Sequence, residues 1–142
     1  MKDHGRFKAK EFEGLRKNLS EVVAFLTDTI SEWGWDSRMF AEMPIAVEEI
    51  FVNIASYAYD RYAAYRPVWV ECGEEDGELV LVFKDSGKKY DPLSHQDPEI
   101  DDPKKATVGG YGIYMVKQIA DGVFYEYDEE KGLNILKLIK KR

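Results

Sequence analysis

Glu49 and Asn53 form the first pair in the chain whose residue types and spacing suit chemistry. They are four residues apart in a run of helical periodicity, so both side chains point the same way, off the apolar stripe. A carboxylate and an amide oxygen suit Mg²⁺, which takes one or two protein oxygens together with waters and substrate phosphates. The carboxylate can also orient or deprotonate an attacking hydroxyl group. Because this spacing occurs by chance in many exposed helices, the pair alone assigns no function.

A second candidate is Asp85-Ser86-Gly87, directly after an apolar run that predicts a buried strand. An aspartate at the end of such a strand can accept a hydrogen bond from an exocyclic amine such as that of adenine. Gly87 has no Cβ and therefore lets a flat base approach. The alternative is an ordinary turn, because Asp and Gly are frequent turn residues.

A third candidate is the glycine cluster of Gly109, Gly110 and Gly112, which precedes a short helical run. Glycines free backbone N–H groups to surround an anion, and the positive end of the helix favours phosphate. The cluster is not a Walker loop, since no GKS or GKT follows, and no parallel βαβ unit surrounds it as in dinucleotide-binding proteins. Lys104 and Lys105, just upstream, either reach the phosphate or belong to a solvated loop.

The elements that must position these residues follow from the hydrophobic periodicity. Helical spacing predicts a helix over residues 15–33 and a second over residues 40–58. Because Pro44 lacks an amide proton, we expect a short turn first and then a main helix that begins near Pro44.

Alternating apolar residues then predict a hairpin over residues 68–83, and a short helix is expected after Gly112. Two further strands are expected at residues 123–127 and 134–139. This order predicts an α+β two-layer sandwich, with helices on one face of a mostly antiparallel or mixed sheet. The polar segment 86–110 is long for a loop in a compact domain, and we interpret it as an active-site lid.

Composition limits the class of protein. The chain has 142 residues, a formal net charge of −7 and one cysteine. We expect a single domain over residues 1–142 with a tail at residues 1–6, a core of its own and a cytoplasmic location. The acidic charge disfavours direct nucleic-acid binding, and no stretch is long enough for a membrane span. Basic residues at both ends, Lys8 and Lys10 among the first and Lys140 and Arg142 among the last, are interpreted as solvated tails or strand edges.

Together, the order and spacing of the three motifs resemble the Bergerat-fold ATPases, the superfamily of gyrase, MutL and histidine kinases. Residues 49–53 (EIFVN) are similar to the N box, residues 85–92 (DSGKKYDP) to the first glycine box, and residues 110–113 (GYGI) to the second. Within that superfamily, the stretches KDSGKKYDP, GGYGIYMVKQIADGVFYEY and NILKLIKK are similar to the stand-alone anti-sigma factor serine kinases.

The resemblance implies a role for each motif. Glu49 would be the catalytic base or orienting carboxylate, and Asn53 would be the Mg²⁺ ligand. Asp85 would read the adenine amine with Gly87 beside it. The remaining glycines, which would bind phosphate from the lid, are Gly109, Gly110 and Gly112.

Some positions depart from the pattern of these relatives. Tyr57 stands where many carry a histidine. The last strand lacks their threonine near the adenine, and either Asn134 or Lys137 lies there instead. An arginine that some of these kinases carry just before the second glycine box is missing, and Lys104 and Lys105 are the nearest cations. The departures leave ATP binding in place and bear on the rate of phosphate transfer.

The resemblance implies an ATP- and Mg²⁺-dependent serine/threonine protein kinase of the anti-sigma type. Such a protein phosphorylates a small anti-sigma-antagonist protein, sequesters a sigma factor and forms a homodimer. The alternative is a binding module that holds ATP and switches partners with slow or no transfer. A catalytic domain cut from a histidine kinase is a weaker interpretation, because no histidine-bearing dimerisation helix pair precedes the motifs.

A tyrosine-rich segment has two possible roles. Tyr57, Tyr59, Tyr62 and Tyr65 lie close together with two arginines between and after them. These residue types favour protein interfaces, yet the segment also suits packing of the helix end against the sheet edge.

Overall fold

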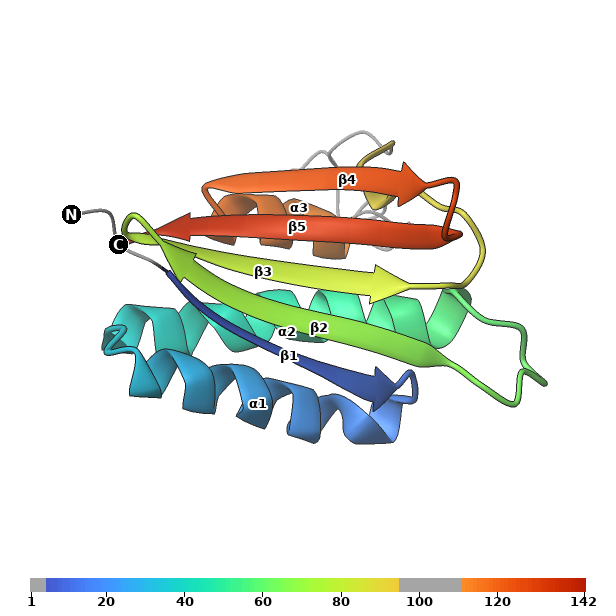
Figure 1. Ribbon diagram of the computed structural model, residues 1–142, viewed down its shortest axis with the longest axis horizontal. Helices are drawn as coiled ribbons and strands as arrows, with labels where there is room; N and C mark the ends of the chain where they lie inside the picture. The colour runs from blue at the N-terminus through green and yellow to red at the C-terminus, as the bar shows by residue number, and fades with distance from the viewer. Residues whose placement is uncertain (1–4, 95–110) are drawn as a thin grey trace.

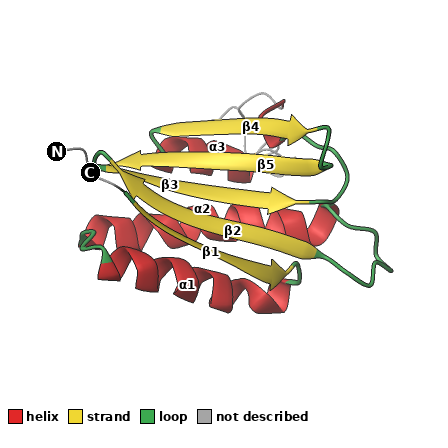
Figure 2. Ribbon diagram, in the orientation of Figure 1, coloured by secondary structure: helices red, strands yellow, loops and turns green. Residues whose placement is uncertain are grey.

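A computed structural model describes residues 5–94 and 111–142 of the chain. Five strands form one sheet, and three helices cover one of its faces (Figure 1, Figure 2). The expected α+β two-layer architecture is confirmed. The elements in chain order are β1 (Arg6–Glu13), α1 (Leu19–Glu32), α2 (Ser37–Tyr57), β2 (Pro67–Glu75), β3 (Glu78–Asp85), α3 (Tyr111–Ile119), β4 (Gly122–Asp128) and β5 (Leu133–Lys141), with 3₁₀ turns at Arg16–Asn18 and Pro92–Ser94.

The sheet has the strand order β1-β2-β3-β5-β4, and every neighbouring pair is antiparallel. Alternate side chains of β2, β3 and β5 are buried against the helices, which is the pattern of a sheet covered on one side. The β3–β5 register pairs Asp85 with Asn134. Both residues therefore lie on the helix-covered face, where β3 ends and β5 begins.

The chain begins with a strand, whereas the expected order began with a helix. β1 is an edge strand, and Phe12 is its one buried side chain. Lys8 and Lys10 occupy other helix-facing positions: Lys8 forms an ion pair with Glu32 of α1, and Lys10 lies 5.2 Å from the centre of the Phe12 ring. With so few apolar residues the strand has no alternating hydrophobic signal, and its inward-facing lysines oppose the addition of a further strand.

The prediction that the main helix begins near Pro44 is wrong. α2 starts at Ser37, after Asp36, whose carboxylate accepts a hydrogen bond from Met39 N at 3.2 Å, and Pro44 lies inside the helix. A proline in a helix interior costs about 3 kcal/mol. The N-cap, together with the burial of Met39 and Met43, offsets that cost.

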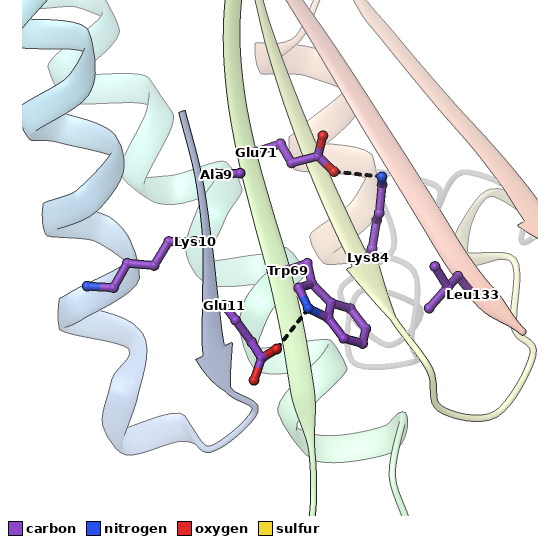
Figure 3. A pocket seen from close by; sticks show the side chains of 7 residues that line it. All are labelled: Ala9, Lys10, Glu11, Trp69, Glu71, Lys84 and Leu133. Carbon is purple, nitrogen blue, oxygen red and sulfur yellow. Dashed lines mark hydrogen bonds and ion pairs between the residues drawn. The ribbon is translucent and has the colours of Figure 1, made fainter. Parts of the chain in front are cut away.

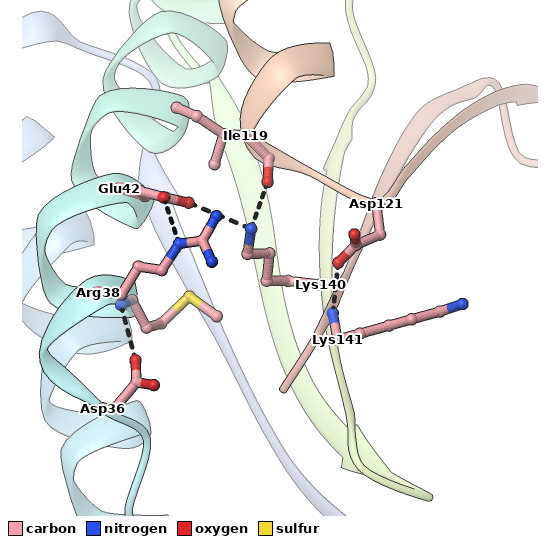
Figure 4. Close-up of polar contacts among 8 residues, drawn as sticks. Asp36, Arg38, Glu42, Ile119, Asp121, Lys140 and Lys141 are labelled. Carbon is pink, nitrogen blue, oxygen red and sulfur yellow. Dashed lines mark hydrogen bonds and ion pairs between the residues drawn. The ribbon is translucent and has the colours of Figure 1, made fainter.

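The far end of α3 is fixed by Lys140, one of the basic residues interpreted as a tail or strand edge (Figure 4). Lys140 Nζ donates to Ile119 O at 2.7 Å and lies 3.2 Å from Glu42 Oε2 on α2. Arg38 donates to the other oxygen of Glu42 at 2.8 Å. The ammonium therefore joins β5, α2 and the C-terminal end of α3.

Arg142 likewise makes specific contacts and is not a solvated tail. Its guanidinium donates to Gly34 O and Trp33 O, each at 3.2 Å, and lies 4.4 Å from the centre of the Trp35 ring. It is also 3.6 Å from a carboxylate oxygen of Glu74 on β2. The last residue therefore ties the α1–α2 turn to the sheet.

In the described part of the chain, no helix combines the length and apolar character that a membrane span requires.

Candidate functional site

Two of the predicted glycines lie against α2, the helix that carries Glu49 and Asn53. A Cβ added to Gly112 would overlap Glu49 Oε2, and one added to Gly87 would overlap the carbonyl oxygen of Ala58. The end of β3 and the start of α3 therefore both lie against the C-terminal half of α2 (Figure 1). Motifs that are far apart in sequence are brought together there.

Glu49 and Asn53 lie on α2 as the periodicity predicts. Ile50 and Phe51 are buried in the core, whereas Glu49 is half-buried and Asn53 is exposed. The Glu49 carboxylate lies against Gly112 in the first turn of α3, and the N–H groups at the start of a helix carry a partial positive charge. That turn stabilises negative charge, so a carboxylate and a phosphate group would both be favoured at this end of α3.

Within residues 5–94 and 111–142, no three His, Cys, Asp or Glu side chains form a metal-binding group. A Mg²⁺ ion that arrives with a nucleotide needs no such group, because phosphates and waters supply most of its ligands. The oxygens of Glu49 and Asn53, one helical turn apart, fit that requirement.

Position 87 requires a glycine because of a tertiary contact that the sequence does not reveal. The backbone passes so close to α2 that a Cβ at this position would lie 2.8 Å from Ala58 Cβ, besides overlapping the carbonyl group. The next residue, Lys88, donates its N–H to Ala58 O at 2.8 Å. The glycine therefore permits a backbone contact that holds the end of α2 against the end of β3.

Asp85 is a buried carboxylate, and one of its two oxygens accepts hydrogen bonds from the protein. Its side chain is only 6% exposed, and Oδ1 accepts hydrogen bonds from Gly87 N and Asn134 Nδ2, both at 3.0 Å. Oδ2 has no hydrogen-bond partner in the described part of the chain. Burial raises the pKa of Asp85, and the two hydrogen bonds to Oδ1 partly oppose that rise. The remaining oxygen can accept a hydrogen bond from a ligand.

Of the two residues named for the last strand, Asn134 lies beside Asp85 and Lys137 does not. Asn134 is 7% exposed on the helix-covered face, and Lys137 is exposed on the opposite face. Sequence reasoning did not assign Asn134 to the site. The available signal was a polar residue at a position where the alternation of β5 requires a buried side chain.

Of the clustered tyrosines, Tyr59 supports the site. Its hydroxyl accepts a hydrogen bond from Ser86 N at 2.9 Å and donates to Pro67 O. Tyr59 thereby fixes the residue next to Asp85. Three other tyrosines of the segment are exposed: Tyr57 by 76%, Tyr62 by 84% and Tyr65 by 64%. Packing against the sheet therefore accounts for Tyr59 and leaves these three on the surface.

Of the predicted phosphate-binding glycines, one lies within the described residues and two lie outside them. Gly112 is the second residue of α3. Gly109 and Gly110 lie outside the described residues, as do Lys104 and Lys105.

A hollow of about 450 Å³ lies on the opposite side of the molecule, on the uncovered face of the sheet (Figure 3). Within it Glu11 accepts a hydrogen bond from Trp69 Nε1 at 2.9 Å, and Lys84 pairs with Glu71 at 2.7 Å. The sheet separates this hollow from Glu49 and Gly112, so it is not part of the site. Its lining residues are Ala9, Lys10, Glu11, Trp69, Glu71, Lys84 and Leu133, of which Lys10 is on the helix-facing side of β1 and only borders the hollow.

Comparison with known proteins matches residues 12–140 to the family described as the histidine kinase-like ATPase domain. A protein of Listeria monocytogenes serovar 1/2a named serine-protein kinase RsbW is 24% identical over 134 residues, which cover 82% of this chain and 77% of that protein. The protein of the same name from Listeria innocua serovar 6a has the same identity and coverage. The one from Listeria monocytogenes serotype 4a is 23% identical over 134 residues. The family match includes all the predicted site residues.

Proposed function

This chain belongs to the histidine kinase-like ATPase domain family, and we propose that it is a serine/threonine protein kinase of the anti-sigma type that binds ATP beside the C-terminal half of α2, against which the end of β3 and the start of α3 lie. The observation that carries the proposal is Asp85, a buried carboxylate whose Oδ2 has no hydrogen-bond partner among the described residues, close to the C-terminal half of α2 that carries Glu49. The names of the relatives support the kinase activity.

Asp85 is the proposed base-reading residue. Its Oδ2 accepts a hydrogen bond from the exocyclic amine of adenine, because Oδ1 is already held by Gly87 N and Asn134 Nδ2. A carboxylate in a buried site makes a strong hydrogen bond of this kind. Its orientation is fixed before the nucleotide arrives.

Glu49 and Asn53 are the proposed phosphate-end residues. Asn53 would hold Mg²⁺ with the nucleotide, and the bound ion would neutralise charge on the β- and γ-phosphates. Gly112, in the first turn of α3, would lie beside the phosphates, and Gly109 and Gly110 are proposed to join it.

In the proposed phosphate transfer, Glu49 interacts with the proton of the substrate hydroxyl group. The hydroxyl oxygen of the substrate serine or threonine bonds to the γ-phosphorus, and the bond to the β-phosphate oxygen breaks with its electron pair on ADP. The hydroxyl proton passes to the Glu49 carboxylate, which acts as base or as orienting group.

The proposed protein substrate is a small anti-sigma antagonist, and the proposed second partner is a sigma factor. We place the reaction in the cytoplasm with the protein as a homodimer, in line with the resemblance to anti-sigma kinases. The net charge of −7 supports protein partners over nucleic acid.

A binding module without turnover is the second candidate. It is favoured by the last strand, which lacks the threonine expected from the resemblance and carries Asn134 beside Asp85, and by the missing arginine before the glycine cluster. This candidate predicts nucleotide-dependent affinity for the partner without a phosphorylated product.

Transfer from [γ-³²P]ATP to the antagonist encoded nearest this protein's gene separates the two candidates. The kinase proposal predicts labelled antagonist with wild-type protein and a loss of label with Glu49→Gln. Glu48→Gln, an exposed neighbour with the same charge change, is the matched control and should transfer normally. Absence of label with a wild type that binds ATP would favour the binding module.

A further inference from the structure

The amide of Asn134 is buried and fully hydrogen-bonded inside the protein. Its Nδ2 donates to Asp85 Oδ1 at 3.0 Å and to Lys88 O at 2.9 Å. Its Oδ1 accepts from Tyr90 N at 3.0 Å and from Tyr125 OH at 2.6 Å. A longer hydrogen bond of 3.5 Å joins Nδ2 to Gly87 O. The amide is therefore held between acceptors on its NH₂ side and donors on its oxygen side.

Only one orientation of the Asn134 amide satisfies these partners. A flipped amide would place its oxygen against the Asp85 carboxylate and the Lys88 carbonyl, and its NH₂ group against the Tyr90 N–H. Because a buried polar group without a partner costs about 1–3 kcal/mol, the flipped state is strongly disfavoured. The side chain thus has a fixed direction toward Asp85.

The fixed amide determines how the Asp85 carboxylate is presented. Asp85 and Asn134 are direct partners in the β3–β5 register, so the backbone places the amide beside the carboxylate. A partial rotation of the carboxylate would weaken the hydrogen bonds that its occupied oxygen receives from Asn134 and Gly87, and a half-turn only exchanges the two equivalent oxygens. Oδ2 is therefore the oxygen that remains for a ligand.

Tyr125 completes the arrangement from β4, the strand on the other side of β5 (Figure 1). Its hydroxyl donates to Asn134 Oδ1, and among the described residues it forms no hydrogen bond with Asp85. Burial raises the pKa of Tyr125, so the hydroxyl keeps its proton at neutral pH and remains a donor.

We infer that Asn134, oriented by Tyr125, is a positioning residue that presents one oxygen of Asp85 to the nucleotide and thereby sets selectivity for a purine with an exocyclic amine. The inference rests on the proposed function, in which Asp85 reads the base. A carboxylate that only accepts hydrogen bonds favours adenosine over inosine, whose carbonyl oxygen at the same ring position offers no donor. Asn134 acts through Asp85, and Tyr125 acts through Asn134.

The test compares the affinities of ATP and ITP, measured by calorimetry with Mg²⁺, for wild type and three variants. Asn134→Leu removes every hydrogen bond of the amide at similar side-chain size, and Tyr125→Phe removes a single hydroxyl group. Tyr127→Phe is the matched control, because Tyr127 is also on β4 and its hydroxyl is not bonded to Asn134.

Wild type is expected to prefer ATP by about tenfold or more. Asn134→Leu should lower the ATP/ITP ratio by about fivefold or more, and Tyr125→Phe by about two- to threefold, because each step loosens the Asp85 carboxylate. Tyr127→Phe should keep the wild-type ratio. Tyr125→Phe removes one oxygen at a half-buried position, so it serves as the test if Asn134→Leu does not fold.

A merely structural role for Asn134 predicts a different result. ATP and ITP would then weaken together, and a ratio within twofold of wild type in both variants would overturn the inference while leaving the proposed function intact. A wild type that binds neither nucleotide, or binds them equally, would overturn the proposed base reading and the inference with it.

Discussion

Gly112 packs against the side chain of Glu49 with no room for a further carbon between them. A Cβ added to Gly112 would overlap Glu49 Oε2 and lie 2.9 Å from Glu49 Cδ. The contact places a carboxylate from α2 against the first turn of α3, and it joins two motifs that are far apart in the sequence. In the proposed kinase, the same contact sets the direction of the catalytic carboxylate.

Gly112→Ala should therefore impair transfer more than folding. The added methyl group meets the end of a flexible side chain, so Glu49 moves while the backbone stays in place. A shift of about 1 Å in a catalytic group costs on the order of 100-fold in rate. We expect a loss of that order in transfer from [γ-³²P]ATP, with little change in the melting temperature. Gly73→Ala is the control, because a Cβ there would meet no atom closer than 3.6 Å. Transfer by Gly112→Ala within twofold of wild type would contradict the assigned role of Glu49.

Gly87→Ala should act in the opposite way and destabilise the fold. Its added Cβ would meet the Ala58 backbone, which cannot move without shifting the end of α2. Overpacking of this kind costs about 1–3 kcal/mol. Urea unfolding measures the loss, with Gly73→Ala again as the control. A midpoint for Gly87→Ala equal to that of the control would show that the Ala58 contact is not tight in solution.

The stability of Asp85→Asn relative to wild type should increase as the pH rises. The pKa of Asp85 is raised in the folded state from an ordinary value of 3.8, because the carboxyl group is buried. The folded protein therefore holds this proton more tightly than the unfolded chain. The stabilisation is present below pH 3.8 and is lost as the pH rises through the folded-state pKa. Asparagine keeps both hydrogen bonds to its oxygen and does not titrate.

The comparison is the urea unfolding free energy of Asp85→Asn minus that of wild type, measured near pH 4 and pH 7. The other titrating groups are shared and cancel in the difference. We expect this difference in unfolding free energy to be more positive at pH 7 than near pH 4. A difference that is constant with pH, or that moves toward wild type, would refute a raised pKa for Asp85.

Lys140→Met should destabilise the protein by about 1–3 kcal/mol, because it removes a charged hydrogen bond to Ile119 O and leaves Glu42 Oε2 without its ion pair. Lys137→Met on the same strand is the control, since Lys137 is exposed on the other face. Denaturant unfolding at pH 7 checks the difference. Equal stability of the two variants would mean that the Lys140 contacts contribute nothing measurable.

Helical periodicity is sufficient to place Glu49 and Asn53 on one face of one helix, because a spacing of four residues fixes a shared face whatever the tertiary structure. Asp85 was found because an apolar run ended at it. The same local signals failed for β1, where burial of one residue, Phe12, gives no period, and for Pro44, where the cap at Asp36 outweighed the proline.

Asn134 and the close contact of Gly87 with Ala58 required the structure. The position of the Asn134 amide beside Asp85 depends on the register between β3 and β5, which no local sequence pattern specifies. The packing of Gly87 depends on where α2 ends relative to the sheet. Both are tertiary relationships between segments that are distant in the chain.

Calorimetric titration of ATP with Mg²⁺ into wild type and Asp85→Asn tests the central claim most directly. Asparagine presents an amide NH₂ group where Oδ2 now accepts, so the amine of adenine loses its partner. We predict binding by wild type and a loss of about tenfold or more in Asp85→Asn, as expected for a hydrogen bond to a charged group. Asp28→Asn, an exposed aspartate on α1, carries the same charge change and should bind normally. Binding by Asp85→Asn within twofold of wild type, or no binding by wild type, would contradict a nucleotide site at this end of the molecule.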